Sequence, residues 1–204
     1  MMTKDELAAR LLRACDVVVA AEGELTEIDS TFGDADHGLT MTKIAKAIRT
    51  AVQDADQDAT VQGLLDDAAM AVMVLNGGSA VPLWNTWLDG LQEAAPDTAE
   101  FDAAQAKAMF ANALAEISDM SGAKVGDKTM MDALIPASAA VAAAEGDVAE
   151  LLAAGAAAAA EGAENSKNFP SKFGRAKSYG EKTIGTPDAG AVSMARFWQG
   201  LAQA

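Results

Sequence analysis

Three carboxylates and the only histidine of the chain lie in one stretch, Asp29-Ser30-Thr31-Phe32-Gly33-Asp34-Ala35-Asp36-His37-Gly38. Its two glycines allow the backbone to turn tightly, so that the carboxylate oxygens can come together. Mg²⁺ prefers oxygen ligands and usually takes one or two carboxylates, keeping its other positions for water and phosphate oxygens. A helix is expected from Leu39 onward, and its free N–H groups would face an anion. The stretch therefore predicts a metal–phosphate site.

Ordinary turns and helix caps also use aspartate and glycine, so N-capping by Asp34 or Asp36 stays open as an alternative. A calcium EF-hand is excluded by spacing. If Asp34 is the first loop position, the glycine comes at the fifth, and Ala45 occupies the twelfth, where a bidentate glutamate is required. Calcium is therefore not the expected ion.

The composition predicts one cytoplasmic domain spanning residues 1–204. A net charge of −15 argues against binding to nucleic acid or an anionic membrane, because both would be repelled. The single cysteine, Cys15, lies among apolar residues and is expected to be a buried structural residue. The N-terminus lacks the apolar region of a signal peptide, and no run is long and apolar enough to span a bilayer.

The hydrophobic pattern predicts an all-α fold of about eight helices, with no sustained strand-like alternation. A glycine stop at Gly122 ends the fifth helix. The expected helices span about residues 5–22, 39–53, 61–75, 80–92, 102–120, a segment after 130, 148–163 and 189–202. The carboxylate-bearing stretch, residues 29–38, is then expected to connect the first two helices.

Two glycine-rich breaks are further candidates for phosphate contacts. Asn76-Gly77-Gly78-Ser79 precedes a helix and offers backbone N–H groups and a hydroxyl, although a flexible turn with an N-cap would look the same. The segment 122–129 superficially resembles a P-loop. A P-loop has four residues between its glycines, a lysine directly after the second one, and a strand before the loop. Here three residues separate the glycines, Asp127 stands between Gly126 and Lys128, and no strand is expected, so a P-loop is excluded.

A long polar segment, residues 166–187, separates the last two helices and is too long for a plain connector. We call it the basic segment, because it holds five of the 15 basic side chains: Lys167, Lys172, Arg175, Lys177 and Lys182. A solvated loop would explain it, but a lid over phosphates needs such local positive charge. Asp188 then opens the last helix, where N-capping is the simplest role.

Taken together, these motifs resemble the nucleotide-binding L subunit of bacterial dihydroxyacetone kinase. The resemblance covers essentially the whole chain, and its motifs occur in the family's order. They are Ile28-Asp29, Gly33-Asp34-Ala35-Asp36-His37-Gly38-Leu39, Gly77-Gly78, Gly126-Asp127-Lys128-Thr129-Met130, Gly180-Glu181-Lys182-Thr183-Ile184-Gly185 and Asp188-Ala189-Gly190.

This resemblance implies an antiparallel eight-helix barrel with a nucleotide, ADP or ATP, bound at one end. Asp29, Asp34 and Asp36 would coordinate two Mg²⁺ ions that bridge the nucleotide phosphates. Lys128 and Arg175 are the candidates for neutralising charge on the transferred phosphoryl group. The nucleotide would be lined by His37, Gly38, Leu39, Thr40, Gly78, Ser79, Gly122, Met130 and Arg175, with Asp188, Ala189 and Gly190 closing the pocket.

The family works with a separate K subunit, which holds a ketose on a histidine and receives the phosphoryl group. In one mode, bound ADP is a fixed cofactor that a phosphotransferase-system protein rephosphorylates; in the other, ATP is an exchangeable substrate. Phosphoryl transfer requires positioning and charge neutralisation more than covalent chemistry by the protein, which suits this division. A non-catalytic, nucleotide-sensing regulatory partner is the alternative function.

Three motifs depart from the family's pattern. The family's Gly-Gly-Ala-Ser-Gly is replaced by Gly77-Gly78-Ser79-Ala80-Val81, the usual Asn after His-Gly-Leu by Thr40, and Asp-Pro-Gly by Asp188-Ala189-Gly190. The metal ligands are unchanged, so these differences fall on the nucleotide wall.

Overall fold

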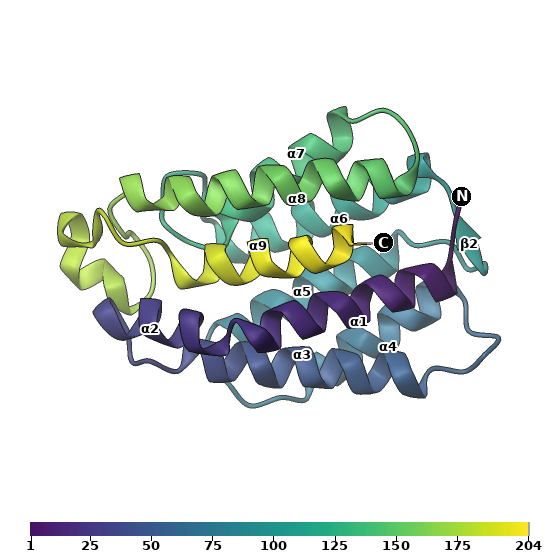
Figure 1. Ribbon diagram of the computed structural model, residues 1–204, viewed down its shortest axis with the longest axis horizontal. Coiled ribbons are helices and arrows are strands. Elements are labelled where there is room, and N and C mark those ends of the chain that lie inside the picture. The colour runs from purple at the N-terminus through teal and green to yellow at the C-terminus, as the bar shows by residue number, and fades with distance from the viewer. Residues whose placement is uncertain (204) are drawn as a thin grey trace.

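The computed structural model describes residues 1–203, and nine α-helices dominate this part of the chain (Figure 1). Two 3₁₀ segments and one pair of two-residue strands complete it. The α-helices are α1 (Lys4–Ala20), α2 (Glu22–Phe32), α3 (His37–Asp54), α4 (Val61–Met73), α5 (Ala80–Glu93), α6 (Ala103–Ser121), α7 (Met131–Ala143), α8 (Val148–Asn165) and α9 (Ala189–Ala202); the 3₁₀ segments are η1 (Ser166–Asn168) and η2 (Arg175–Thr183).

Eight of these helices form a closed ring. Contacts run from α1 to α3, through each successive helix to α9, and from α9 back to α1. Sequential neighbours run antiparallel, so the expected all-α, eight-helix barrel is confirmed (Figure 1). The ninth helix, α2, lies outside the ring and packs against α3 and α9 at one end.

The prediction for the first helix was wrong at its C-terminal end. The expected helix continued to Glu22, but α1 ends at Ala20 and α2 begins at Glu22. Only Leu25 is buried on α2, so this helix has almost no apolar face from which its periodicity could be recognised. As a result, Asp29 lies on a helix, and only residues 33–36 form the connection to α3.

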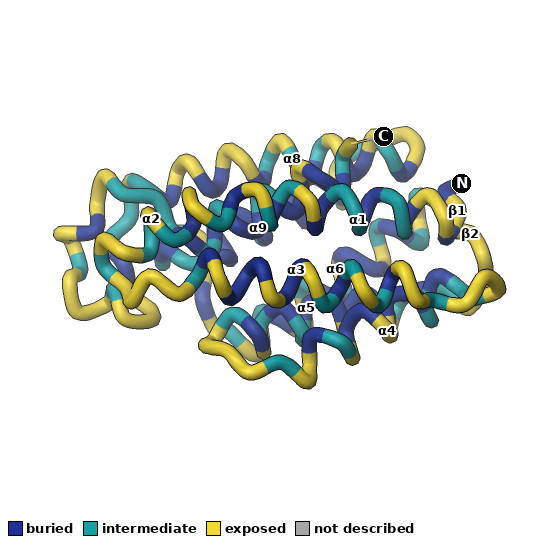
Figure 2. The backbone as a smooth tube through the Cα atoms, turned by 60° about the horizontal axis from the view of Figure 1, so that its bottom comes forward, coloured by how far each residue is buried: buried dark blue, intermediate teal, exposed yellow. Residues whose placement is uncertain are grey.

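Aromatic side chains fill the centre of the barrel. Trp84 and Trp87 of α5 pack edge-on against each other and against Phe197 of α9, with ring centroids 5.0–5.7 Å apart. All three are at most 1% exposed. Exposed residues follow the outer sides of the helices and the connections at the ends (Figure 2). This edge-to-face geometry is favourable for aromatic pairs and makes the core rigid below the site.

Small residues allow neighbouring helices to approach closely. A Cβ atom added at Gly200 of α9 would lie 2.3 Å from the Cα atom of Ala14 in α1. One added at Gly155 of α8 would lie 2.4 Å from the ring of Trp198. The alanine-rich helix α8 is therefore tightly packed against α9.

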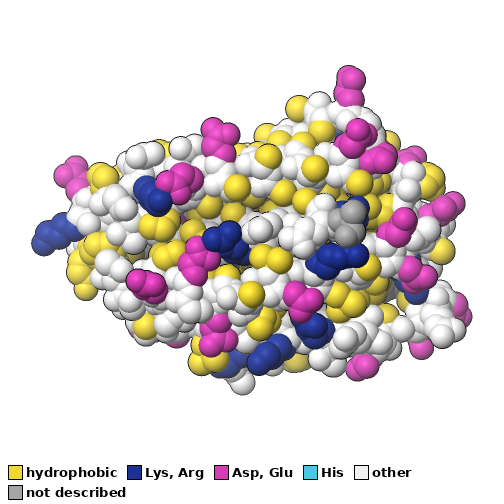
Figure 3. All heavy atoms as spheres, in the orientation of Figure 1, with side chains coloured by type: hydrophobic (Ala, Val, Ile, Leu, Met, Phe, Trp, Pro, Cys, Tyr) yellow, Lys and Arg dark blue, Asp and Glu magenta, His cyan; other side chains and the backbone are white. Residues whose placement is uncertain are grey.

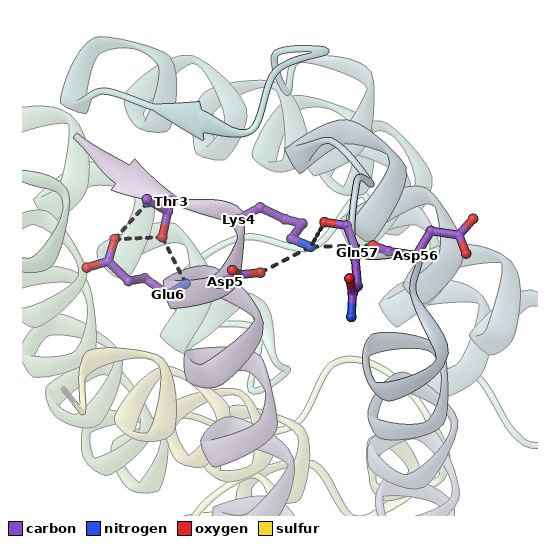
Figure 4. Close-up of polar contacts among 6 residues, drawn as sticks. All are labelled: Thr3, Lys4, Asp5, Glu6, Asp56 and Gln57. Carbon is purple, nitrogen blue, oxygen red and sulfur yellow. Dashed lines mark hydrogen bonds and ion pairs between the residues drawn. The ribbon is translucent and has the colours of Figure 1, made fainter.

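The N-terminus is fastened at the end of the barrel opposite α2 (Figure 1). Strand β1 (Met2–Thr3) pairs with β2 (Glu100–Phe101), and Thr3 forms a capping box with Glu6 at the start of α1. The Lys4 ammonium group donates to the carbonyl of Gln57 at 3.0 Å and to that of Asp56 at 3.4 Å (Figure 4). These contacts tie the start of α1 to the connection between α3 and α4.

Acidic side chains are spread over the face shown in Figure 3 rather than gathered in one patch. Among the described helices, none combines the length and the apolar character needed to cross a membrane.

Candidate functional site

Four helix N-termini meet around one cavity. Because the ring is antiparallel, α3, α5, α7 and α9 all begin at the end where α2 lies. The cavity has a volume of about 570 Å³ and is lined at these N-termini by His37, Ala80, Met130 and Ala189. The N-terminus of a helix carries a partial positive charge. The cavity is therefore built to attract an anion.

The three predicted carboxylates lie together at this cavity. Asp29 lies in the last turn of α2, and Asp34 and Asp36 come from the connection that follows. One oxygen from each lies within 4.8 Å of the others. A Cβ atom at Gly33 would lie 2.0 Å from the Asp29 carboxylate, so only glycine allows the turn to close this tightly.

Backbone amides hold Asp29, whereas the other two carboxylates face outward. Asp29 Oδ2 accepts from the N–H groups of Asp36 at 3.1 Å and His37 at 3.3 Å. Asp36 occupies the N-cap position of α3, but in the described structure its side chain makes no capping hydrogen bond. The capping alternative therefore does not account for Asp36. Exposed carboxylates leave space for water and phosphate oxygens around an ion, so the donor set fits Mg²⁺.

His37 is held in place by a contact with the last helix. Its Nε2 atom lies 3.0 Å from Ser193 Oγ, and the Ser193 hydroxyl donates to the carbonyl of Gly190 at 2.9 Å. Because that proton is used, the Ser193 oxygen can accept a hydrogen bond from His37 Nε2. Burial lowers the pKa of His37, although Asp29 and Asp36 oppose this change. The contact ties α3 to α9 beside the carboxylates.

The loop before α7 is shaped by an internal carboxylate. Asp132, 1% exposed, accepts from the N–H groups of Gly126 at 2.6 Å and Thr129 at 2.7 Å. These two amides are therefore occupied, which agrees with the exclusion of a P-loop. Gly122 adopts a left-handed conformation (φ 64°) as the C-cap of α6, as the sequence predicted.

Lys128 is buried behind this loop. Its ammonium group donates to the carbonyls of Ser166 and Thr186, which are the two ends of the basic segment. Burial lowers the pKa of Lys128, and Asp188 and Asp132 counteract the effect. The side chain lines the cavity, but these contacts aim it at the protein backbone.

The altered Gly77–Val81 turn still reaches the cavity. Gly78 and Ser79 both line it, together with Thr40. Within the described residues, no side chain caps α5, and Ser79 leaves its hydroxyl without a capping role. The turn can therefore offer amide groups and one hydroxyl to an anion.

The basic segment lies across the mouth of the cavity. Arg175 forms an ion pair with Asp34, and Phe173 and Gly174 also line the cavity. Lys172 pairs with Asp127 at 2.7 Å, which fixes the start of the segment to the loop before α7. These contacts agree with a lid rather than a loop extending into solvent.

Asp188 closes the cavity at the start of α9. Its carboxylate accepts from the N–H group of Ala191 at 2.7 Å, so the predicted N-cap is present. Burial raises its pKa to about 7, against the effects of that hydrogen bond and of Lys128.

Three of the predicted nucleotide residues do not line the cavity. Gly38 packs on α2, where an added Cβ atom would meet the Glu22 carbonyl at 2.2 Å. Leu39 is 51% exposed, and Gly122 caps α6. The remaining predicted residues line it, namely Asp29, Asp34, Asp36, His37, Thr40, Gly78, Ser79, Lys128, Met130, Arg175, Asp188, Ala189 and Gly190.

Apart from Met130 and Ala189, the apolar part of the wall was not predicted. Leu83, Met120 and Phe173 line the cavity, and Met120 and Phe173 are 50% and 40% exposed. Such a wall suits a flat aromatic group, whereas the carboxylates and helix N-termini suit a charged one.

Comparisons with known proteins find kinases and a kinase subunit among the relatives of this chain. The chain is 35% identical over 197 residues to a D-erythrulose kinase of Mycolicibacterium smegmatis, covering 93% of this chain and 33% of the relative. It therefore spans about a third of the length of that protein. It is 27% identical over 207 residues to the ADP-binding subunit DhaL of a PEP-dependent dihydroxyacetone kinase of Escherichia coli, covering 100% of this chain and 98% of the relative.

Solved structures show the same fold. The dihydroxyacetone kinase of C. freundii, in complex with AMP-PNP and Mg²⁺, matches with a TM-score of 0.72 and 25% identity. The match covers 96% of this chain and 33% of the larger one. The DAK2 domain family model matches residues 31–203. This chain belongs to the DAK2 domain family.

Proposed function

We propose that this protein is the nucleotide-binding, phosphoryl-transfer subunit of a ketose kinase of the dihydroxyacetone kinase type. The observation that carries the proposal is the meeting of three carboxylates and four helix N-termini at one cavity. Carboxylates alone would suit a cation, and helix N-termini alone an anion. Their combination suits a metal ion together with the phosphates it neutralises.

Asp29, Asp34 and Asp36 would hold Mg²⁺, and the three-carboxylate set is large enough for two ions. The metal would supply neutralisation of the negative charge on the phosphate oxygens. The helix N-termini and the Gly78–Ser79 turn would orient those phosphates. Leu83, Met120 and Phe173 would cover the adenine ring.

Arg175 is the candidate for stabilising charge on the transferred group, since it reaches Asp34 from the basic segment. Lys128 would contribute mainly by holding the two ends of that segment, because its ammonium group is bonded to their carbonyls. His37 would orient the start of α3 through Ser193.

The ketose would be supplied by a separate K subunit. The chain's only histidine is partly buried and bonded to Ser193, so it is not placed to hold a sugar covalently. The erythrulose kinase relatives are about three times as long as the matched region, which leaves room for such a function in their other parts. The E. coli relative is itself the ADP-binding subunit of a dihydroxyacetone kinase.

Two modes of operation are compatible with this proposal. Bound ADP would act as a fixed cofactor rephosphorylated by a phosphotransferase-system protein, or ATP would be an exchangeable substrate. Gel filtration without added nucleotide, denaturation and mass spectrometry distinguish them. Retained ADP supports the first mode, whereas an empty protein that exchanges Mg-ATP freely supports the second.

The metal assignment is tested with Asp34→Asn, which keeps the size of the side chain and removes its charge. Calorimetry with Mg-ADP and Mg-ATP should show at least tenfold weaker binding than in wild type. Asp67→Asn, an exposed position on α4, is the matched control and should bind normally. Unchanged binding in Asp34→Asn would refute the metal site.

Transfer is tested by adding a K subunit and labelled ATP to the wild type, with dihydroxyacetone as the ketose. Labelled ketose phosphate only when both subunits are present supports the proposal. A nucleotide-dependent complex with a protein that is not a kinase subunit, without transfer, would instead support the regulatory alternative.

A further inference from the structure

The tip of the basic segment, residues 175–179 of η2, touches the opposite wall of the cavity at two points. Arg175 forms the ion pair with Asp34, and the ring of Tyr179 packs on that of Phe32. The two ring centroids are 5.2 Å apart, with an angle of 56° between the planes. Phe32 is the last residue of α2, so both contacts fall on the stretch that carries the carboxylates.

The base of the basic segment is firmly held. The N–H group of Ser171 donates to Thr183 Oγ1 at 2.9 Å, and the Thr183 hydroxyl donates to the carbonyl of Gly180 at 2.7 Å. Thr183 is fully buried. The N–H group of Gly185 donates to the Lys167 carbonyl at 2.8 Å. These bonds fix both ends of the segment but make no contact with α2.

Glycines with left-handed backbones flank the tip. Gly174, with φ 61°, immediately precedes η2, and Gly180, with φ 51°, breaks it internally. A Cβ atom built at either position would lie more than 4 Å from every atom beyond the adjacent residues of the chain and the backbone of η2. Glycine changes between such conformations without the penalty that other residues meet. The tip can therefore pivot relative to its base.

The ion pair is too exposed to hold the tip by itself. The side chains of Arg175 and Asp34 are 69% and 34% exposed. An exposed ion pair of this kind usually shifts the equilibrium between the held and the released tip by less than about fivefold. An aromatic pair contributes up to about tenfold and is not screened by salt. Tyr179 is itself 47% exposed, so the two contacts are comparable in strength, and only the ring contact persists at high salt.

We propose that Tyr179 is a positioning residue: by packing on Phe32, it holds Arg175 at the carboxylate end of the cavity and slows the release of bound Mg-nucleotide. This inference rests on the proposed function for its ligand. It adds a residue that has no chemical part in transfer but sets how long the nucleotide stays in place.

The first test is the release of Mg-bound N-methylanthraniloyl-ADP, chased with excess ADP in stopped flow. Tyr179→Ala should release it about 3- to 10-fold faster than wild type, since the ring contact is lost. Tyr179→Phe keeps the ring and should release it at the wild-type rate. Phe32→Ala should match Tyr179→Ala, and the double variant should be no faster than either single one.

The second test needs no nucleotide. Limited trypsin digestion, followed by mass spectrometry, measures cleavage after Arg175 and Lys177 in the tip. Tyr179→Ala should be cut there several times faster than wild type and Tyr179→Phe, while its unfolding temperature stays the same. Faster cleavage in a protein that binds no nucleotide would uphold the contact and refute the proposed function. Equal cleavage and equal release in Tyr179→Ala and Tyr179→Phe would overturn this inference.

Discussion

Asp188 carries the clearest pH dependence among the residues of the site. Burial raises its pKa from 3.8 to about 7 in the folded protein. Between these values, the folded state holds a proton that the unfolded state has released, so this group makes folding less favourable as the pH rises. The effect grows from about pH 4 and is complete above about pH 7.

Asp188→Asn removes this charge and keeps an oxygen that can accept from the N–H group of Ala191. The free energy of unfolding of the variant, minus that of wild type, should therefore increase from pH 5 to pH 8. The slope should be no steeper than about 1.4 kcal/mol per pH unit. Urea denaturation at several pH values measures it, and a flat or falling difference would contradict the assigned pKa.

Lys128→Met tests the internal role of that lysine. Methionine fills a similar space but cannot donate, so the carbonyls of Ser166 and Thr186 lose the ammonium group. The expected loss is about 1–3 kcal/mol in the free energy of unfolding. Lys43→Met, an exposed position on α3, is the control and should change stability by less than about 0.5 kcal/mol. Equal stability of the two variants would mean that Lys128 is not a structural tie.

At the scale of the helix, close packing decides the effect of a glycine substitution. Gly155→Ala would place a methyl group 2.4 Å from the ring of Trp198, so either the ring or α8 must move. We expect a loss of about 1–3 kcal/mol, since overpacking outweighs the better helix propensity of alanine. Gly23→Ala on α2 meets no neighbouring atom within 4 Å and should gain up to about 1 kcal/mol. Thermal unfolding compares them; a stabilised Gly155→Ala would contradict the packing argument.

The helices of the ring were predictable because each has an apolar face that packs on its neighbours. The segment 39–53 was predicted as a helix, and its Ile44, Ile48 and Val52 form the apolar face that is buried on α3. Helix α2 was missed because it lies outside the ring and packs on α3 and α9 with Leu25 as its one buried residue. One buried residue shows no periodicity. The pair β1–β2 was missed because two residues are too few to show alternation.

The ligand-like side of the site was predictable, whereas its apolar side was not. Asp29, Asp34 and Asp36 are close in sequence, and Gly33 marks the turn that brings them together. Met120 and Phe173 come from segments more than fifty residues apart, so only the closed ring places them at one wall. The direction of Lys128 likewise depends on carbonyls that the fold brings from both ends of the basic segment.

At the scale of the whole molecule, ring closure gives the site its direction. An even number of antiparallel helices places alternate N-termini at one end, and α2 adds the carboxylates there. The acidic chain, with net charge −15, would repel a free nucleotide. The repulsion is overcome only at the cavity. There, the helix N-termini, the basic segment and a bound cation together provide a local positive potential.

The stability of the whole chain should therefore depend on Mg²⁺ and nucleotide together. Mg²⁺ relieves the repulsion among the three carboxylates, and the nucleotide then bridges it to the helix N-termini. A ligand present at about 100 times its dissociation constant raises the free energy of unfolding by about 2.7 kcal/mol. For a protein of this size, the unfolding temperature then rises by roughly 5–10 °C. Differential scanning fluorimetry should show this shift for Mg-ADP, a smaller one for Mg²⁺ alone, and none for Na⁺ at the same ionic strength. Asp34→Asn should lose most of it, whereas an equal shift from ADP in the presence of EDTA would show that the nucleotide binds without the metal.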